Sequence, residues 1–343
     1  MSKKNVLNVK NMNVSFKSHG QEVKAVRGVS FSVDQGEIVG LVGESGSGKS
    51  VTMKAVMGIL PDNAERTAES ILLNERELKD LSDEECRKVR GKEMTMIFQD
   101  PMTALNPLKK IGSQIEEVII RQRKCSKNEA KEKALEMLKK VGIPNPEVRL
   151  GQYPHEFSGG MRQRVLIAMA LACEPELLIA DEPTTALDVT IQAQILDLMR
   201  NLKDKINSSI MLITHDLGVI AEMADYVVVM YAGRVVEKGT ASEIFKNPSH
   251  PYTIGLMRSK PVVGKKVDKL YSIPGKVPNP IDMPDYCYFR DRCELSCDKC
   301  QGSYPGVIKL SPTHEVSCYR YADRPEAGRL ANVHPGEGGK THE

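Results

Sequence analysis

The chain has 343 residues, with 48 basic against 45 acidic side chains and a formal net charge of +3. This length suits one large domain with additions, and the near balance of charge excludes a sequence-wide electrostatic footprint for nucleic acid. No apolar run of about 18 residues could span a bilayer, and the start MSKKNVLNVK lacks the apolar stretch of a secretory signal. We therefore expect a cytosolic protein without a nucleic-acid partner.

The first sixty residues predict strands, followed by a strand, a turn and a helix. Segments 6–16 and 24–37 alternate in polarity and are rich in β-branched residues, which is typical of half-buried strands. IVGLVG, residues 38–43, is a short apolar run of the kind that fills a buried parallel strand. A glycine-rich turn and a helical stretch at 50–60 follow it, so this region contains a strand–loop–helix unit.

Residues 86–155 predict a helical subdomain inserted into the sheet domain. The composition becomes charged and helical there, and segments 111–124 and 127–142 have the pattern of helices. The second of these ends in a glycine that follows two lysines and a valine, as helix ends commonly do.

Strands and helices alternate again after residue 156. Helices are expected at 159–172 and 190–206, buried strands at 177–183 and 210–216, and two more strands at 225–233 and 234–240 around a tight turn at Ala232-Gly233. Repeated βα units imply a parallel sheet that is covered on both faces. The predicted fold class is therefore α/β.

The composition changes once more beyond Pro248, where a segment with four prolines, residues 272–286, leads into a group of cysteines. We divide the chain accordingly. The expected parts are 1–85 (an N-terminal β subdomain with the phosphate-loop part of the core), 86–155 (the helical subdomain), 156–245 (the rest of the core), 246–325 (a Cys-rich extension) and 326–343 (a disordered tail).

GESGSGKS, residues 43–50, matches the phosphate-binding loop pattern and lies between a predicted strand and a predicted helix. Its glycines let backbone N–H groups turn toward phosphates, and the helix directs its positive dipole end at them. We assign Lys49 to the β- and γ-phosphates and the Ser50 hydroxyl to magnesium. A glycine-rich turn that binds nothing is the alternative, which the flanking elements disfavour. The expected nucleotide contacts in this loop are Gly43, Glu44, Ser45, Gly46, Ser47, Gly48, Lys49, Ser50 and Val51.

Two adjacent carboxylates, Asp181 and Glu182, end the buried run LLIADEP. Ligands bind at the carboxyl ends of strands in open α/β sheets, and neighbours on a strand point to opposite faces. If the strand continues through both residues, Asp181 is placed to hold magnesium and Glu182 to polarise the attacking water. A solvated pair of carboxylates is the alternative.

FSGGMRQR, residues 157–164, predicts a second anion site. Ser158 stands at a helix N-cap position, with Gly159 and Gly160 in the first turn. A simple cap is the alternative for these residues alone. Two phosphate-binding helix ends in one chain suggest a nucleotide held between two copies.

The order of these motifs resembles that of the ATP-binding cassette (ABC) ATPases over roughly residues 5–260. The motifs are GESGSGKS, IFQDP, FSGGM, LLIADEP, TALD and ITHD. The resemblance implies a phosphate-loop NTPase (RecA-like) ABC cassette with an antiparallel β subdomain, an inserted helical subdomain and a small Cys-rich C-terminal extension. It also implies two subunits stacked head to tail, with ATP and Mg²⁺ between the phosphate loop of one and the FSGGM signature of the other.

The resemblance also implies roles for single residues. Asp188 lies at the dimer interface, His215 contacts the γ-phosphate, and Gln99 touches magnesium and the attacking water. Phe16 matches an aromatic that stacks on adenine, although a strand Phe is as often core. The complete expected set is catalytic Glu182, His215, Gln99 and Lys49; magnesium ligands Ser50, Gln99 and Asp181; and further ATP contacts Phe16, Ser158, Gly159, Gly160 and Asp188.

Two stretches resemble a smaller group of proteins within this family. IFQDPMTALNP and the HPYT at 250–253 resemble the ATPase subunits of bacterial oligopeptide, dipeptide and nickel importers, and GESGSGKSVT resembles their D-type subunit. The implied partners are a second, F-type ATPase, two membrane permeases and an extracytoplasmic peptide-binding protein, with a homodimer possible in isolation. The implied location is the cytoplasmic face of the membrane.

Five of the eight cysteines fall in the spacing Cys287-x5-Cys293-x3-Cys297-x2-Cys300-x17-Cys318. Four thiolates suffice for an iron–sulfur cluster or a zinc site, and this proline-rich segment is too small to fold on its own core. Free thiols are the alternative. By resemblance to peptide-importer ATPases, Cys287, Cys293, Cys300 and Cys318 bind a [4Fe–4S] cluster and Cys297 is spare, while zinc stays open.

Two rival functions stay open beside the peptide importer. One is a nickel importer ATPase of the same family. The other is a non-transport ABC ATPase in which a redox-sensing metal domain is the working part. Such non-transport ATPases usually fuse two cassettes or carry long coiled coils, and this sequence has neither.

Overall fold

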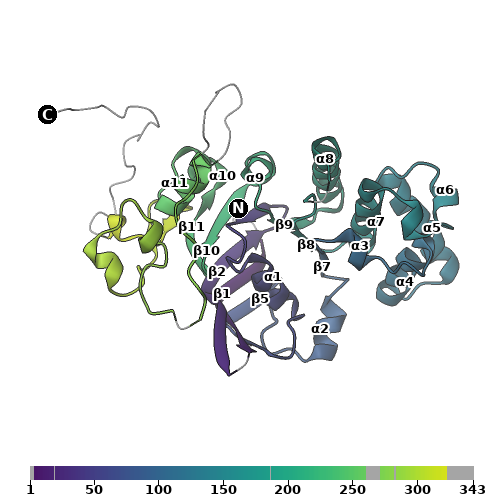
Figure 1. Ribbon diagram of the computed structural model, residues 1–343. Coiled ribbons are helices and arrows are strands. Elements are labelled where there is room, and N and C mark those ends of the chain that lie inside the picture. The colour runs from purple at the N-terminus through teal and green to yellow at the C-terminus, as the bar shows by residue number, and fades with distance from the viewer. Residues whose placement is uncertain (1–3, 19, 186, 260–270, 282, 323–343) are drawn as a thin grey trace.

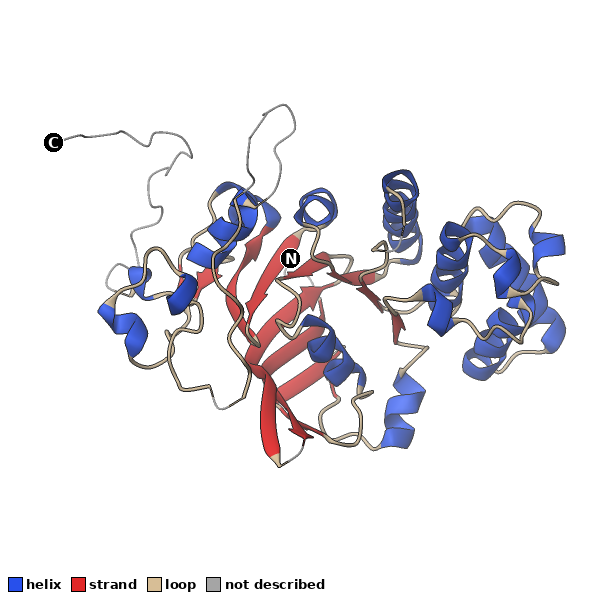
Figure 2. Cartoon of the chain, viewed as in Figure 1, coloured by secondary structure: helices blue, strands red, loops and turns tan. Residues whose placement is uncertain are grey.

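The computed structural model describes residues 4–18, 20–185, 187–259, 271–281 and 283–322. A large sheet occupies the middle of the molecule (Figures 1 and 2). The helices between residues 101 and 171 gather at one end of it, and the C-terminal segment, yellow-green in Figure 1, lies at the other.

The larger sheet contains, among the described residues, eight strands in the order β12-β13-β11-β10-β3-β9-β8-β7. Neighbours from β10 to β7 are parallel, whereas β11, β12 and β13 extend the sheet antiparallel. The strand bounds are Ile38–Val42 (β3), Met94–Ile97 (β7), Leu177–Asp181 (β8), Ser209–Ile213 (β9), Tyr226–Tyr231 (β10), Arg234–Thr240 (β11), Ile308–Lys309 (β12) and Glu315–Val316 (β13).

The smaller sheet is antiparallel, with the order β2-β1-β5-β6 and β4 paired to β1. Its strands are Asn5–Ser18 (β1), Gln21–Asp34 (β2), Ala64–Thr67 (β4), Ser70–Leu73 (β5) and Arg76–Glu77 (β6). β1 and β2 confirm the two strands predicted at the start of the chain.

Eleven α-helices lie in the described part of the chain. They are Lys49–Met57 (α1), Asp83–Val89 (α2), Pro101–Ala104 (α3), Ile111–Arg123 (α4), Lys127–Lys140 (α5), Pro146–Arg149 (α6), Gly159–Leu171 (α7), Val189–Ile206 (α8), Leu217–Met223 (α9), Ala241–Lys246 (α10) and Pro251–Arg258 (α11). Local chemistry sets several ends: Ser126 and Glu129 form a capping box that begins α5, and Lys124 ends α4 in the left-handed conformation.

The two faces of the larger sheet carry different cores because successive strand residues point to opposite sides. Val39 and Leu41 of β3 pack with α1 and the smaller sheet, whereas Ile38 and Val42 belong to the core that contains α7, α8 and α9. All five residues of β3 are buried. This confirms the predicted parallel sheet covered on both faces.

The tight turn predicted at Ala232-Gly233 is confirmed. Both residues have positive φ, 46° and 82°, which is the conformation of a type I′ hairpin, and they join β10 to β11.

The division into domains stays a prediction. One element within the range 86–155 is not helical, since β7 pairs in parallel with β8 and belongs to the larger sheet. α4 and α5 pack together and contact α7, so the helical group also takes in a helix from beyond residue 155. The predicted tail, 326–343, lies outside the described residues.

Residues 271–281 and 283–322, which are called the extension from here on, complete the larger sheet and use its core. β13 pairs with β11, and Tyr288 and Phe289 are buried in the core on the α7 side of the sheet. We expected this segment to need a metal because it lacks a core of its own. The structure gives another reason for its order, because its large side chains are buried against the cassette.

A buried carboxylate holds the extension to β11. Glu237 is 1% exposed and accepts hydrogen bonds from the backbone N–H groups of Ser249 and His250, at 2.7 and 2.9 Å. Its Oε1 lies 2.7 Å from Nε2 of His314, in the turn before β13. A single buried side chain therefore joins β11, the start of α11 and the extension.

None of the helices in the described ranges combines the length and the apolar character that crossing a bilayer requires.

Replacing Glu237 with alanine is expected to lower the free energy of unfolding by about 3 kcal/mol or more, because buried donors would lose their acceptor. Urea unfolding at neutral pH measures this difference. Glu315→Gln is the matched control on β13, the strand that pairs with β11, since Glu315 is partly exposed and its ion pairs are of the surface kind. Equal, small effects of the two changes would contradict the role given to Glu237.

Candidate nucleotide site

The phosphate loop has a backbone that side chains would obstruct. Gly43, Gly46 and Gly48 have φ values of 153°, 78° and 95°. A Cβ at Gly43 would collide with the carbonyl oxygen of Met230 at the end of β10, and one at Gly48 would come within 2.6 Å of the Ala25 carbonyl oxygen. Gly43 and Gly48 are therefore required by the close approach of neighbouring strands as well as by the turn, and Gly46 by its positive φ alone.

The loop leads into α1, whose N-cap Gly48 offers no side-chain hydrogen bond to the first turn. The N–H groups at this helix end are thus left for an external anion. Lys49 is buried, and its Nζ donates to the carbonyl oxygens of Gly43 and Glu44 at 2.8 and 3.0 Å. Burial lowers the pKa of Lys49, while the charges of Glu182, Asp181 and Glu44 act in the opposite direction.

Asp181 ends β8 beside the first turn of α1. The Ser50 hydroxyl donates to its Oδ1 at 2.8 Å, which joins the phosphate loop to the acidic strand end. Burial raises the pKa of Asp181, against the lowering effect of that hydrogen bond. A buried carboxylate next to a hydroxyl supplies the hard oxygen donors that Mg²⁺ prefers, so these two residues fit the predicted magnesium site.

Glu182 does not continue the strand. β8 ends at Asp181, and Glu182 has a φ of 48°, in the left-handed region. The strand therefore does not continue through both residues, which was the condition for their pointing to opposite faces. A backbone turn at Glu182 separates the two carboxylates instead. A non-glycine residue with this conformation is uncommon and often marks a functional position.

Three side chains converge on the Glu182 carboxylate. Gln99 Nε2 donates to Oε2 at 3.0 Å, the Thr185 hydroxyl donates to Oε2 at 2.9 Å, and His215 Nδ1 lies 3.3 Å from Oε1. Burial acts to raise the pKa of Glu182, but the contacts with Thr185 and His215 and the charge of Lys49 outweigh it and leave that pKa lowered. The carboxylate is thus kept ionised and ready to accept a proton or orient a water.

The structure therefore brings Gln99, Glu182 and His215 together, as the family resemblance implies. Sequence reasoning missed Thr185, although EPTTALD contains a hydroxyl three residues after the predicted catalytic carboxylate. It also missed Tyr252, whose hydroxyl accepts a hydrogen bond from the Glu44 N–H at 2.7 Å.

The signature lies elsewhere on the molecule. Ser158 caps α7 by accepting from the Met161 N–H, and Asp188 caps α8 by accepting from the Ile191 N–H. Ser158, Gly159 and Asp188 are exposed. α7 belongs to the group of helices at one end of the sheet, apart from α1 (Figure 1). The role of these residues with nucleotide stays a prediction.

Phe16 lies in β1 opposite Val23 and Ala64 and packs, partly buried, against the core beside the smaller sheet. Its stacking on adenine stays a prediction. Ser45 and Gly46 are exposed at the tip of the loop, and Val51 is half-buried in α1.

The late cysteines gather in the extension. The pKa of Cys287 is raised to about 11 and that of Cys318 to about 12. Burial is the largest cause, and the neighbouring thiols add to it. The thiols of Cys287, Cys293 and Cys300 all act on Cys318, so the four predicted ligands share one neighbourhood. Cys297, predicted as spare, has its Sγ 3.7 Å from that of Cys300.

The predicted metal site in the extension is nevertheless not supported by this arrangement. Across the described ranges, no three or more His, Cys, Asp or Glu side chains are grouped so that they could hold a metal ion.

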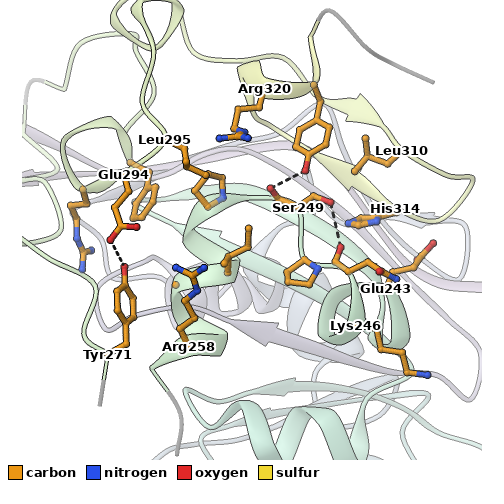
Figure 3. A pocket seen from close by; sticks show the side chains of 18 of the residues that line it. Glu243, Lys246, Ser249, Arg258, Tyr271, Glu294, Leu295, Leu310, His314 and Arg320 are labelled. Carbon is orange, nitrogen blue, oxygen red and sulfur yellow. Dashed lines mark hydrogen bonds between the residues drawn. The ribbon is translucent and has the colours of Figure 1, made fainter. Parts of the chain in front are cut away.

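A cavity of about 550 Å³ separates α10 and α11 from the extension (Figure 3). Arg258 and Tyr271 line one side and Leu295 and Arg320 another, and Glu294 accepts a hydrogen bond from the Tyr271 hydroxyl. The cavity contains none of the predicted nucleotide contacts. Arg292, which contacts the phosphate loop, forms part of its wall.

Two family matches cover much of the chain. Residues 26–185 match the family described as ABC transporter, and residues 236–300 match the one described as oligopeptide/dipeptide transporter, C-terminal region.

Similar proteins include the dipeptide transport ATP-binding protein DppD of Bacillus subtilis (strain 168), 51% identical over 95% of this chain and 98% of that protein. The oligopeptide transport ATP-binding protein OppD of the same organism is 53% identical over 92% of this chain and 88% of its own length. Among solved structures, the dimeric ATP-binding cassette MJ0796 bound to ADP and Pi aligns with a TM-score of 0.62 and 27% identity, covering 68% of this chain and 98% of that one.

Glu182→Gln is expected to lower ATP turnover by about 100-fold or more while leaving ATP binding within about threefold, because the amide keeps the shape and loses the proton acceptor. Phosphate release and equilibrium binding of Mg-ATP, measured on the same preparation, test this. Turnover at the wild-type rate in the variant would contradict the assignment of Glu182.

Proposed function

The chain belongs to the ABC transporter family, among the ATP-binding proteins of oligopeptide and dipeptide transporters, and from this we propose that its ATP hydrolysis drives the import of short peptides. The site supports the proposal through one contact above all. The Ser50 hydroxyl on Asp181 brings a phosphate-binding helix end beside an acidic strand end, which is the arrangement that ATP hydrolysis needs.

The roles of the chain's own residues follow from their positions. Backbone N–H groups at the start of α1 and the Lys49 ammonium bind the phosphates, and Ser50 and Asp181 hold magnesium, which neutralises phosphate charge when bound. Glu182 orients and polarises the attacking water. Gln99 and His215 fix the direction of its carboxylate and lie where they can contact water and the γ-phosphate.

The signature residues act on a nucleotide held by another subunit. Ser158 and Gly159 are exposed at the start of α7, and Asp188 is exposed at the start of α8. An exposed helix N-terminus is suited to bind the phosphates of a nucleotide presented from outside. The dimeric MJ0796 cassette, bound to ADP and Pi, is a relative in which two cassettes pair. We propose the same head-to-tail closure for this chain.

We propose that the chain works at the cytoplasmic face of the cell membrane with four partners, which are a second, F-type ATPase, two membrane permeases and an extracytoplasmic peptide-binding protein. ATP closes the two ATPases, closure moves the permeases, and hydrolysis reopens the pair. Peptide is favoured over nickel as cargo because the relatives named above are peptide transporters.

Affinity purification of the chain from detergent-solubilised membranes is expected to recover two permeases and a second ATPase. ATP hydrolysis by the recovered complex is expected to rise when peptide and its binding protein are added. A free homodimer that hydrolyses ATP at full rate and recovers no membrane protein would instead favour a function outside transport.

The cysteine cluster is a separate proposal. We propose that Cys287, Cys293, Cys300 and Cys318 hold a [4Fe–4S] cluster, with zinc as the second choice. Two observations support this: the thiols of Cys287, Cys293 and Cys300 raise the pKa of Cys318, and Cys300 and Cys318 are buried. Metal binding there would deprotonate the thiols of Cys287, Cys293 and Cys318, whose pKa burial raises. The present arrangement of the thiols does not itself form a metal site, so side-chain rotation must accompany binding.

Elemental analysis of anaerobically purified protein tests this. About four irons and four sulfides per chain, with visible absorbance, are expected for a cubane cluster. One zinc without colour would replace the cluster by a zinc site, and absence of both metals would leave the cysteines as free thiols.

A further inference from the structure

Glu44, the residue after Gly43 in the phosphate loop, forms hydrogen bonds through its backbone N–H, its carbonyl oxygen and its carboxylate. Its N–H donates to the Tyr252 hydroxyl at 2.7 Å, and its carbonyl oxygen accepts from Lys49 Nζ at 3.0 Å. Its carboxylate receives both terminal nitrogens of Arg292, at 2.6 and 3.0 Å. The contact with Arg292 spans 248 residues of sequence.

The Glu44–Arg292 pair is bidentate, which is the geometry that makes arginine–carboxylate contacts strong. The Arg292 side chain is 5% exposed and that of Glu44 28% exposed, so solvent screens the pair only in part. Arg292 Nε also donates to the Pro274 carbonyl oxygen at 2.7 Å, which fixes the plane of the guanidinium. The Glu44 carboxylate raises the pKa of Arg292 above the ordinary arginine range.

Arg292 is carried by the extension and not by the cassette core. It ends a short 3-10 turn, Arg290–Arg292, immediately before Cys293. Phe289, at the start of the same turn, packs against Tyr231 and Tyr252 with ring centroids 5.3 and 5.4 Å away. Because Tyr252 also accepts from Glu44, the extension reaches the phosphate loop both through an ion pair and through an aromatic cluster.

We propose that Arg292 is a positioning residue for ATP binding: it fixes the phosphate loop in place through Glu44 and so makes the nucleotide site depend on the C-terminal extension. The inference rests on the proposed function, because it takes this loop as the one that binds ATP.

Two physical effects follow from the pair. A loop already fixed in its binding conformation loses less conformational freedom when the phosphates arrive, which strengthens binding. In addition, Glu44 places a negative charge in the loop that receives a polyanion. Arg292 neutralises that charge, and without it the carboxylate would repel the phosphates.

The second effect gives the proposal a distinctive test. Arg292→Ala leaves the Glu44 carboxylate uncompensated and is expected to raise the KM for ATP about tenfold, while kcat stays within about twofold. Glu44→Gln introduced into the same variant removes the repelling charge and is expected to bring the KM back to within about threefold of wild type.

Two further variants complete the design. Arg292→Lys keeps a positive charge but loses the fork, and is expected to raise the KM about threefold. Arg320→Ala is the matched control, since Arg320 is an exposed arginine of the same extension and lines the neighbouring cavity away from the loop. Its KM is expected to equal that of wild type. Steady-state hydrolysis at varied Mg-ATP gives KM and kcat, and thermal unfolding of each variant establishes that it is folded.

The proposal is overturned if folded Arg292→Ala or Arg292→Lys protein has the wild-type KM. It is equally overturned if the raised KM of Arg292→Ala persists in the double variant. A KM raised by the charge of Glu44 falls when that charge is removed, whereas a KM raised by lost structure in the extension does not. Wild-type protein that binds no ATP would instead contradict the proposed function itself, so the two failures are distinguishable.

Discussion

The structure depends on one constraint, which is that the loop after β3 must pass very close to the neighbouring strands and lead into a helix whose first N–H groups can bind an anion. Gly43 lies against the end of β10 and Gly48 against β2, where a Cβ would meet a carbonyl oxygen. The parallel register of β10, β3, β9 and β8 then brings the strand ends to one edge of the sheet. Asp181 therefore meets Ser50, and the chemistry of the site follows from the topology of the sheet.

Glu182 shows how the site differs from an ordinary strand end. Its left-handed backbone turns the carboxylate away from the strand direction, and hydrogen bonds from Gln99 and Thr185 together with the His215 contact hold it in place. Gln99 follows β7, and His215 follows β9. The segments after the strands on both sides of β8 thus supply hydrogen-bond partners for Glu182. Such contacts from several elements stabilise a backbone conformation that would otherwise be strained.

Much of the cassette could be predicted from sequence because its signals are local. Apolar runs predict β3, β8 and β9, helical periodicity with a closing glycine predicts α5, and the motif spacing selects Lys49, Asp181 and Glu182. What escaped prediction depends on long-range contacts. β7 lies in a charged, helix-rich stretch and is a strand because β8 pairs with it, and the conformation of Glu182 cannot be read from the order of residues.

The extension illustrates the same limit. Its prolines and cysteines suggest a small, metal-stapled appendage, whereas its order comes from pairing with β11, from the buried Glu237 and from Phe289 in the cassette core. Nothing in the sequence around Arg292 indicates that this side chain contacts the phosphate loop 248 residues away. The extension is thus part of the cassette's structure, and one of its cysteines, Cys293, directly follows the residue that contacts the loop.

The central claim is that ATP hydrolysed by this chain drives movement of peptide across a membrane. The most direct measurement follows the uptake of a labelled short peptide and the release of phosphate together, in proteoliposomes that contain the chain, its partner ATPase and the permeases. The account predicts that both signals need Mg-ATP and that both vanish when this chain is left out. Peptide uptake that continues at the same rate without this chain would contradict it.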